Sequence, residues 1–492
     1  MLNELLNFTC KQLRDKIAGG SVKSVDATGA VLDQIEKLDP DIGAYISTCR
    51  EQALETARSI DKKIANGEPV GALAGVPIAV KDNMCTSFGA TTCASKILQN
   101  FKSPYDAYVI DKLTGADAVI VGKCNMDEFA MGSSTENSGI QQTANPWDIT
   151  RVPGGSSGGS TAAVAARMCF GALGSDTGGS IRQPASFCGV VGLKPTYGRV
   201  SRFGLVAYGS SLDQIGPVTR DVADSALLLN VISGRDERDS TCVSKDIAGD
   251  CDYLAEIDKP VDGLRIGIVS EFNKGADADV QKAIVAAIDV YKQLGAEIIE
   301  IEMPHFEYAI AAYYVIATAE ASSNLARYDG VHFGHRTSAP KDYVEVYSKS
   351  RAEGFGSEVK RRIMLGTFVL SSGYYDAYYL RALKVRNLIR GDFTNAFAKT
   401  DCIMMPVSPT TAFKKGEKTA DPLQMYLADV YTIAANLAGI PGISIPCGFD
   451  ASDLPIGLQI LSDVFTEDKL LRIARMFEAK TDFHTKTPTV IA

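Results

Sequence analysis

The sequence predicts an α/β protein built around a central, covered β-sheet. Short apolar runs typical of buried strands alternate with segments of helical periodicity along much of the chain. With 492 residues, of which 46% are hydrophobic and 22% charged, the chain can bury a large core. No fixed-period repeat and no low-complexity linker divides it, so we expect one domain spanning residues 1–492.

The N-terminal part is predicted to begin with helices and to continue with buried strands. Apolar side chains recur at helical spacing in Val25–Leu38, and Glu51–Ala65 is charged and alanine-rich, so residues 1–65 read as helical. Further elements are then predicted in this order: strands at Val76–Val80 and Ala116–Gly122, and a short helix at Ser160–Met168. The first of these strands ends at Lys81, which places a lysine at the end of a buried strand.

The C-terminal half continues the alternation of strands and helices. We predict a strand, a helix and a strand at Leu264–Val269, Asp279–Leu294 and Ala296–Ile301. Three helices are predicted at Tyr308–Arg327, Glu358–Leu370 and Asp376–Phe397. The chain is predicted to close with strands at Cys402–Met405, Ile443–Pro446 and Gly457–Leu461 and a helix at Glu467–Ala479.

The charge balance argues against a protein that captures nucleic acid by itself. The chain carries 59 acidic and 50 basic side chains, a net charge of −9. A self-sufficient nucleic-acid binder usually shows a basic excess or a long basic stripe. Here the basic residues form only short clusters such as Lys360-Arg361-Arg362, so contact with RNA is expected to depend on a partner.

The cysteines, the histidines and the N-terminus point to a cytoplasmic protein without a metal. There are 11 cysteines with no CxxC pair, and only 4 histidines, so no convincing zinc ligand set can be assembled. Scattered cysteines of odd number are typical of reduced, buried thiols. The N-terminus lacks the basic and apolar blocks of a signal peptide, and no apolar run reaches the ~20 residues of a membrane span.

Three short segments carry the candidate chemistry. Two are rich in glycine and carry serines, and the third follows a buried strand: Gly154–Ser160, Asp176–Arg182 and Lys81–Asn83. Between residues 154 and 204 the chain holds 12 of its 44 glycines. An even spread would place about 5 there, so this window is built from backbone in special conformations. Such a window is typical of an active-site floor.

A catalytic serine here needs a base other than histidine. No GxSxG elbow is present, and the histidines lie far downstream without a motif, at positions 305, 332, 335 and 484. A lysine can act as the base if burial lowers its pKa from about 10.4 toward neutrality. A second serine can pass the proton on, because a hydroxyl both donates and accepts. Backbone amides near Thr177, Gly178 and Gly179 could face the developing oxyanion.

Each of these segments also has an interpretation without chemistry. A run of glycine and serine is most often a flexible loop, and before a helix it can cradle phosphate. A lysine at the end of a strand is usually a solvated cap. No Gly-Lys-Ser/Thr follows either run, which argues against a phosphate-binding loop. The combination of two serine segments joined by an alanine-rich helix is far more specific than either part.

These motifs resemble the amidase signature family, whose signature region corresponds to about Arg151–Leu205. The resemblance covers essentially the whole chain and includes Gly75-Val76-Pro77 and Pro455–Gln459. It implies a single large domain with a central mixed β-sheet covered by helices on both faces. The helical segment would occupy about residues 1–65 and the signature core about 70–230, and the remainder would complete the sheet and the substrate pocket.

The resemblance also assigns roles to the three segments. It implies a Ser–cis-Ser–Lys triad, in which Ser180 is the nucleophile, Ser156 relays the proton and Lys81 is the base. The cis peptide bond is expected at Gly155–Ser156. A cis bond before a residue other than proline costs about 3 kcal/mol, which indicates a functional constraint.

Within that family the sequence is similar to the amidase subunits of bacterial glutamyl-tRNA(Gln)/aspartyl-tRNA(Asn) amidotransferases. The similarity lies in Met126–Ser134, Glu136–Ser138, Ala319–Gly330 and Glu358–Gly366. It implies a glutaminase that supplies ammonia to the B subunit of the enzyme, which activates mischarged tRNA with ATP and magnesium. A small C subunit would hold the two together in a heterotrimer. The chain itself would need no cofactor, and it would meet tRNA only through the B subunit.

Glutamine as the substrate would require partners for its two charged groups. The resemblance points to Arg362 for the α-carboxylate, Asp429 for the α-ammonium and Tyr313 as a lining residue. Each has an alternative: the basic run of Arg362 could be a solvated helix face, and Asp429 could face water. Tyr313 could belong to the core, because Tyr314 is adjacent.

Two other functions remain to be separated from the glutaminase. A free-standing amidase acting on small or aryl amides would share the triad, and an assay on glutamine against simple amides distinguishes the two. A non-catalytic scaffold or nucleotide-binding protein would form no covalent adduct and would tolerate loss of Ser180. The intact triad segments argue against the scaffold.

Overall fold

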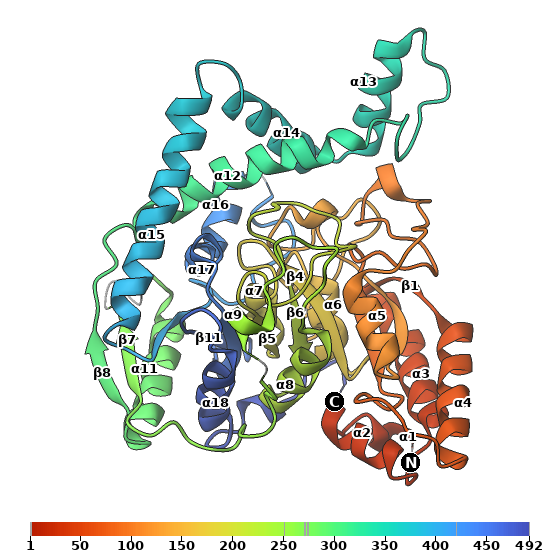
Figure 1. Ribbon diagram of the computed structural model, residues 1–492, viewed down its shortest axis with the longest axis vertical. Helices are drawn as coiled ribbons and strands as arrows, with labels where there is room; N and C mark the ends of the chain where they lie inside the picture. Colours follow the sequence, from red (N-terminus) through yellow and green to blue (C-terminus); the bar gives the residue numbers. More distant parts are fainter. Residues whose placement is uncertain (1, 250, 270–271, 273–274, 420, 492) are drawn as a thin grey trace.

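The computed structural model describes residues 2–249, 251–269, 272, 275–419 and 421–491. Its strands form one mixed sheet in the order β1-β3-β2-β4-β6-β5-β10-β11-β9-β7-β8 (Figure 1). They are β1 Tyr45–Thr48, β2 Pro77–Lys81, β3 Val119–Cys124, β4 Gly171–Asp176, β5 Val191–Lys194, β6 Gln214–Thr219, β7 Arg265–Ile268, β8 Glu297–Glu300, β9 Cys402–Pro406, β10 Gly442–Phe449 and β11 Pro455–Leu461. β2 pairs in parallel with both β3 and β4, whereas the middle of the sheet, from β4 through β6, β5, β10 and β11 to β9, is antiparallel.

The helices occupy both faces of this sheet and a third region above it. The longer ones are α2 Cys10–Ala18, α3 Ser24–Ile42, α4 Arg50–Ala65, α5 Tyr108–Gly115, α6 Gly158–Ala165, α7 Arg182–Cys188, α8 Val222–Ile232, α11 Ala278–Gln293, α12 Ala309–Asn324, α13 Tyr343–Gly354, α14 Ser357–Val369, α15 Arg381–Phe397, α17 Ile433–Ala438 and α18 Glu467–Glu478. Short helical segments include η1 Lys96–Leu98, η2 Glu128–Ala130, η5 Tyr375–Leu380, α16 Pro422–Tyr426 and η6 Leu427–Asp429.

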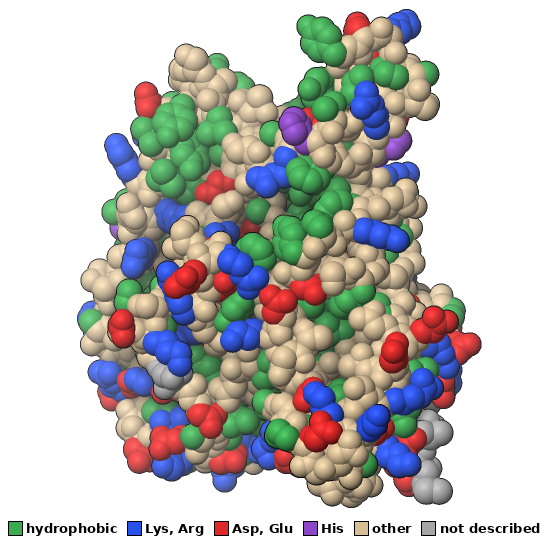
Figure 2. Space-filling model, turned by 45° about the vertical axis from the view of Figure 1, so that its right-hand side comes forward, with side chains coloured by type: hydrophobic (Ala, Val, Ile, Leu, Met, Phe, Trp, Pro, Cys, Tyr) green, Lys and Arg blue, Asp and Glu red, His purple; other side chains and the backbone are tan. Residues whose placement is uncertain are grey.

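The sheet is sandwiched between two groups of helices. α6 and α7 pack on each other and on the central strands, whereas α8, α11 and α18 form a second set that packs on the same strands. Above the sheet, α12 packs on α14, α15 and α17, and α13 projects as an arm (Figure 1). In the view of Figure 2, acidic and basic side chains are mixed over the lower part, and hydrophobic ones gather near the top.

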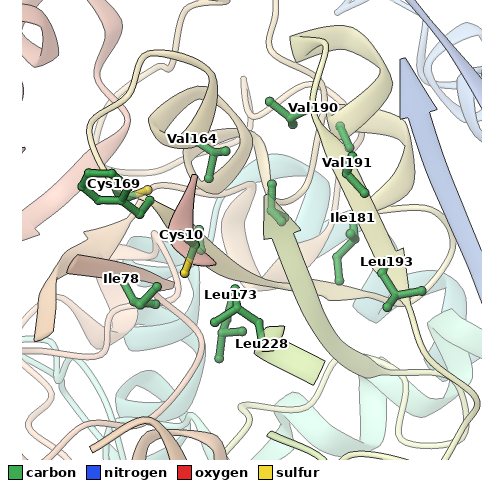
Figure 3. Packing of buried hydrophobic residues seen from close by; sticks show 14 of the residues in the cluster. Cys10, Ile78, Val164, Cys169, Leu173, Ile181, Val190, Val191, Leu193 and Leu228 are labelled. Carbon is green, nitrogen blue, oxygen red and sulfur yellow. The ribbon is translucent and has the colours of Figure 1, made fainter. Parts of the chain in front are cut away.

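Part of the largest hydrophobic cluster lies where β2, β4 and β5 meet α8. Figure 3 shows Ile78 and Leu173 close to Leu228 of α8, with Val191 and Leu193 along β5. Every residue of β4 is buried, although most of them are glycine, serine or aspartate. The strand therefore owes its place to pairing on both sides rather than to intrinsic strand propensity.

Helix ends follow ordinary capping chemistry. Thr9 caps α2 reciprocally with Gln12: its hydroxyl accepts from the Gln12 amide at 3.2 Å, and its own amide donates to the Gln12 side chain at 3.0 Å.

In α4 the buried residues Ala53, Ala57 and Ile60 share one face, as helical spacing requires.

The predicted fold class is confirmed: the chain forms one α/β domain with a central mixed sheet covered by helices on both faces. The predicted strands and helices are present, with ends shifted by a few residues. The sequence analysis missed β4, β5 and β6, and it missed β1 inside the segment expected to be helical. None of the helices in the described residues is both long and apolar enough to cross a membrane.

Candidate active site

The parallel pairing of β2 and β4 brings the lysine and one serine segment to the same edge of the sheet. Ile78 of β2 lies opposite Gly171 of β4, and both strands run in the same direction. Lys81 is the last residue of β2, and Ser180 lies in the short loop between Asp176, which ends β4, and α7. The segment with Ser156 precedes α6, which packs on both strands. Three segments separated by up to about a hundred residues thus converge at one point.

Lys81 lies at the centre of this edge and touches only hydroxyl and carbonyl oxygens among the described residues. Its Nζ donates to Ser156 Oγ at 2.7 Å and to Ser157 Oγ at 2.9 Å. It also donates to Ser175 Oγ at 2.9 Å and to the Ser175 carbonyl at 3.3 Å. The predicted pairing of the lysine with Ser156 is therefore present, and the alternative of a solvated lysine cap is wrong, because Lys81 is fully buried.

This environment disfavours the charged form of the lysine. Burial lowers the pKa of Lys81 to about 7, although the carboxylates of Asp127, Asp176 and Asp213 partly oppose the shift. Near neutral pH a substantial fraction of Lys81 is therefore uncharged and able to accept a proton. The neighbouring oxygens fix the amine in direct contact with Ser156.

The two serine segments are joined through their backbones. The Gly155–Ser156 peptide bond is cis, at the position expected from the family resemblance. The amide of Ser157 donates to the carbonyl of Ser180 at 3.1 Å, so the residue after Ser156 contacts the loop that carries Ser180. Ser180 keeps 8% exposure, whereas Ser156 has none. Of the two, Ser180 is the serine that a substrate can reach.

A buried ion pair shapes the loop that carries Ser180. Arg182 Nε and Nη2 each lie 3.0 Å from a carboxylate oxygen of Asp176, and neither side chain is exposed. Burial alone would raise the pKa of Asp176, but Arg182 holds it well below its usual range. Arg182 also donates to Asn436 and Gln459, which ties the loop to α17 and β11.

The loop amides differ in their availability for an oxyanion. The Gly179 amide donates to Asp176 Oδ1 at 2.8 Å, so the ion pair already engages this predicted oxyanion group. Within the described part of the chain, the amides of Thr177, Gly178 and Ser180 donate to no hydrogen-bond acceptor. The Thr177 hydroxyl donates to Asp213 at 2.7 Å, which fixes the start of the loop. Of the three predicted oxyanion amides, those of Thr177 and Gly178 are therefore free to bind an oxyanion, as is that of Ser180.

Arg362 lies in a cage rather than on a solvated helix face. It is 3% exposed, and its Nε donates to Glu358 Oε1 at 2.8 Å, one helical turn earlier in α14. Its Nη1 donates to the hydroxyl of Tyr208 at 2.6 Å. Its guanidinium also lies over three aromatic rings, those of Tyr208, Tyr314 and Tyr426 at 5.6, 5.3 and 5.4 Å.

Tyr313 directly contacts the loop that carries Ser180. A Cβ added to Gly178 would lie 2.7 Å from the Tyr313 hydroxyl, so the ring lies against the Gly178 backbone. Its ring also packs edge-on against Tyr314, with centroids 5.1 Å apart. Tyr313 thus joins the site to the arginine cage. Tyr313 is 5% exposed, which fits the core alternative, and its lining of a substrate pocket stays a prediction.

Asp429 offers a buried carboxylate with one oxygen free. Its Oδ2 accepts from the Ser133 hydroxyl, and its Oδ1 is buried without a hydrogen-bond partner among the described residues. Burial raises the pKa of Asp429 to about 7. Thr432 Oγ1 lies 3.0 Å from the Asp429 carbonyl and 2.7 Å from that of Gly178, so Asp429 is anchored to the loop that carries Ser180. The expectation that it could simply face water is wrong, because only 9% of it is exposed.

Several residues of the site escaped the sequence analysis. They are Ser157 and Ser175 around Lys81, Glu358 and Tyr208 around Arg362, and Ser133 against Asp429. A signal existed for Glu358, which precedes Arg362 by four residues and so faces it on a helix. Ser133 lies in the conspicuous segment Met126–Ser134. Tyr208 had no signal, because only the tertiary fold brings it to α14.

Three of the four histidines pair with carboxylates that are not part of this site. His305, His332 and His335 contact Asp392, Asp329 and Glu353 at 2.9, 2.7 and 2.6 Å. Among the described residues no group of three or more histidine, cysteine, aspartate and glutamate side chains is arranged to hold a metal ion. The 11 cysteines are free thiols.

Comparison with known families agrees with the fold. A family model described as Amidase matches residues 26–471. The chain therefore belongs to the amidase family.

Individual relatives show which members of the amidase family this chain resembles. The chain is 57% identical to the A subunit of the glutamyl-tRNA(Gln) amidotransferase of Carboxydothermus hydrogenoformans, over 99% of both chains. It is 56% identical to the protein of the same name from Nostoc sp., over 98% of this chain and 99% of that one. The crystal structure of the same enzyme's A subunit from Thermotoga maritima aligns with a TM-score of 0.78 at 44% identity, covering 98% of this chain and 94% of the other. The peptide amidase of Stenotrophomonas maltophilia gives a TM-score of 0.82 at 29% identity, covering 96% of each chain.

Proposed function

We propose that this chain is the glutaminase component of a tRNA-dependent amidotransferase and that Ser180 forms the acyl-enzyme. One observation carries the choice of substrate: a buried arginine and a buried carboxylate with a free oxygen both connect to the nucleophile loop. Arg362 does so through the tyrosine cage and Tyr313, and Asp429 through Thr432. A free α-amino acid carries the complementary carboxylate and ammonium groups.

The proposed reaction begins with transfer of a proton toward Lys81. Neutral Lys81 accepts the proton of Ser156, which in turn takes the proton of Ser180 as its Oγ attacks the carboxamide carbon of glutamine. The amides of Gly178 and Ser180 stabilise the oxyanion that develops on the carbonyl oxygen. The carbon–nitrogen bond then breaks, the proton returns along the same path to the leaving nitrogen, and ammonia departs.

Water completes the cycle. It attacks the ester carbon of the acyl-enzyme and gives up a proton along the same path, so glutamate leaves and Ser180 is regenerated. Throughout, Arg362 binds the α-carboxylate, Asp429 binds the α-ammonium and Tyr313 lines the pocket between them and the nucleophile. Selectivity arises because an amide without these charges leaves both groups unpaired.

The ammonia is proposed to pass to a second protein of the assembly rather than to solvent. The curated relatives are named as A subunits of an amidotransferase, which supports an assembly with B and C subunits in the cytoplasm. The B subunit uses ATP and magnesium to convert Glu-tRNA(Gln), Asp-tRNA(Asn) or both to the amide form. The chain itself needs no cofactor for glutamine hydrolysis, and the B subunit provides the main contact with tRNA.

The experiment compares glutamate release by three samples: the chain alone, its complex with the B and C subunits, and that complex with mischarged tRNA and ATP. We expect slow release by the chain alone and a higher rate in the complete system, because the partner shifts the population toward the aligned triad. A maximal rate for the chain alone, together with equal activity on simple aryl amides, would favour a free-standing amidase.

A further inference from the structure

A basic hollow lies outside the active site, at the base of the projecting arm. It has a volume of about 460 Å³, and it is formed by η1, the residues that follow η1, and the loop of residues 334–336. Four of its nine lining residues are basic, Lys96, Lys102, His335 and Arg336, and none is acidic. In Figure 2, basic side chains and histidines are visible on and below the arm. This local charge is opposite to the net charge of −9.

The cations of the hollow form few ion pairs, although Lys96 interacts electrostatically with the buried carboxyl of Glu128. Lys96, Lys102 and Arg336 are exposed, and none of them forms an ion pair with a residue that the structure describes. His335 is the exception, because its Nε2 lies 2.6 Å from Glu353. Three unpaired cations around one hollow attract an anion with several charges more strongly than a single charge.

The walls of the hollow are fixed against each other. The amide of His335 donates to the carbonyl of Ile97 at 2.7 Å. A Cβ on Gly334 would lie 2.8 Å from the same carbonyl, and the residue has a φ of +90°, so both the close approach and the backbone favour glycine. Two segments more than two hundred residues apart are thereby held in one surface.

An aromatic ring lies next to the cations. Phe333, directly before Gly334, is 47% exposed, and its ring packs edge-on against Phe101 with centroids 6.2 Å apart. Phe101 itself lines the hollow. An exposed aromatic ring beside unpaired cations matches the chemistry of RNA, in which phosphates alternate with stackable bases. An acidic peptide would use the cations but would not require the ring.

We propose that this hollow binds the phosphate backbone of the tRNA held by the assembled amidotransferase, with Phe333 offered to a base. The inference rests on the proposed function, which brings tRNA to the complex. It adds a direct contact to the one made through the B subunit. The overall acidity of the chain still prevents it from capturing RNA alone, and the hollow acts once the partner has docked the tRNA.

The test reverses three charges in the assembled complex with the B and C subunits. Binding of fluorescent tRNA to the Lys96→Glu, Lys102→Glu, Arg336→Glu triple variant is measured by anisotropy over a series of salt concentrations. We expect at least about tenfold weaker binding at low salt, and a salt dependence smaller by about 2 to 3 in log–log slope, because each phosphate contact contributes about 0.7–0.9.

A matched control carries the same change in net charge elsewhere. Lys62, Lys282 and Lys399 are exposed on α4, on α11 and after α15, away from the arm (Figure 1). Their triple reversal to glutamate should leave both affinity and slope close to those of the unchanged complex. Phe333→Ala should weaken binding by about fivefold to tenfold and keep the salt slope, because stacking releases no counterions.

Three outcomes would overturn the proposal. Equal tRNA affinity for the triple variant and the control would show that the hollow makes no contact with the phosphates. Loss of association with the B or C subunits would make the hollow a protein-docking surface. Tripolyphosphate or inorganic phosphate that binds the unchanged complex but not the variant, with tRNA binding unaffected, would identify a site for free phosphate. Glutamate release without tRNA tests the proposed glutaminase separately, because the triple variant leaves the triad intact.

Discussion

Lys81 and Arg362 are both buried cations of one active site, but their surroundings act in opposite directions. Lys81 contacts hydroxyls and a carbonyl, and burial lowers its pKa to about 7. Arg362 contacts Glu358 and three tyrosine rings, which hold its pKa above its usual value despite burial. A base must be able to lose its charge, whereas an anchor for a carboxylate must keep it. The partners of each cation match its proposed role.

We expect the largest loss of activity when Ser180, the proposed nucleophile, is changed. Lys81 is proposed to activate this serine, and Arg362 to hold the substrate that it attacks. Ser180→Ala should reduce glutamate release by the assembled complex at least about 10⁴-fold, because no acyl-enzyme can form. Ser160 provides the control, since its hydroxyl donates to the Leu173 carbonyl at 3.1 Å and does not touch Lys81. Ser160→Ala should retain activity, and thermal unfolding should show that both variants fold. Substantial activity in Ser180→Ala would contradict the account.

Removing the base or the relay should cost nearly as much. Lys81→Ala and Ser156→Ala are each expected to lower turnover by about 10²–10⁴-fold, the usual range for general-base catalysis. The double variant should be little worse than the poorer single one, because both residues serve one proton path. Steady-state kinetics of the unchanged protein, the two single variants and the double variant provide the double-mutant cycle. Strict additivity of the two losses would argue against a relay.

Removal of Arg362, the proposed anchor of the substrate carboxylate, should reduce the hydrolysis of glutamine selectively. Arg362→Ala should lower kcat/KM for glutamine by about 10²-fold, or roughly 3 kcal/mol, since the substrate carboxylate would be left unpaired. Hydrolysis of a neutral amide without that carboxylate should change much less. Arg361→Ala is the matched control, because its side chain is 43% exposed and pairs with the same Glu358. Equal losses on both substrates would make Arg362 structural.

A change of pH should have the smallest of these effects, and it should act on turnover through Lys81 and on substrate binding through Asp429. Lys81 must lose a proton to act as a base, so kcat should fall about tenfold per unit as pH drops below about 7 and level off above it. Asp429, with its pKa raised to about 7, must also be ionised to bind the ammonium, so KM for glutamine should rise over the same range. An amide without the ammonium should lose the KM effect and keep the kcat effect. A kcat independent of pH between 6 and 8 would exclude Lys81 as the titrating base.

The three segments proposed to carry the chemistry stood out in the sequence because each is a short segment of unusual composition. Glycine-rich backbone around Ser156 and Ser180 left a local signature, and a buried strand pointed to Lys81. The strands that hold these segments left no such signature in the sequence. β4 and β6, Gly171–Asp176 and Gln214–Thr219, carry glycine, serine and proline, and only pairing with their neighbours makes them strands.

The substrate pocket was harder to predict for a different reason. Arg362, Asp429 and Tyr313 were assigned by resemblance alone, because each comes from a separate element and none carries a local motif. Their decisive contacts join distant parts of the chain, as in Ser133 to Asp429 and Tyr208 to Arg362. Periodicity within one helix could have revealed only Glu358, four residues before Arg362.

Covalent trapping tests the central claim most directly. An electrophilic glutamine analogue is incubated with the assembled complex, and the modified residue is identified by mass spectrometry of its peptides. The account predicts one adduct on Ser180, absent from Ser180→Ala and slowed in Lys81→Ala, because formation of the adduct needs the same proton path. An adduct on a buried thiol such as Cys188, the last residue of the helix α7 that follows Ser180, would show that serine is not the nucleophile.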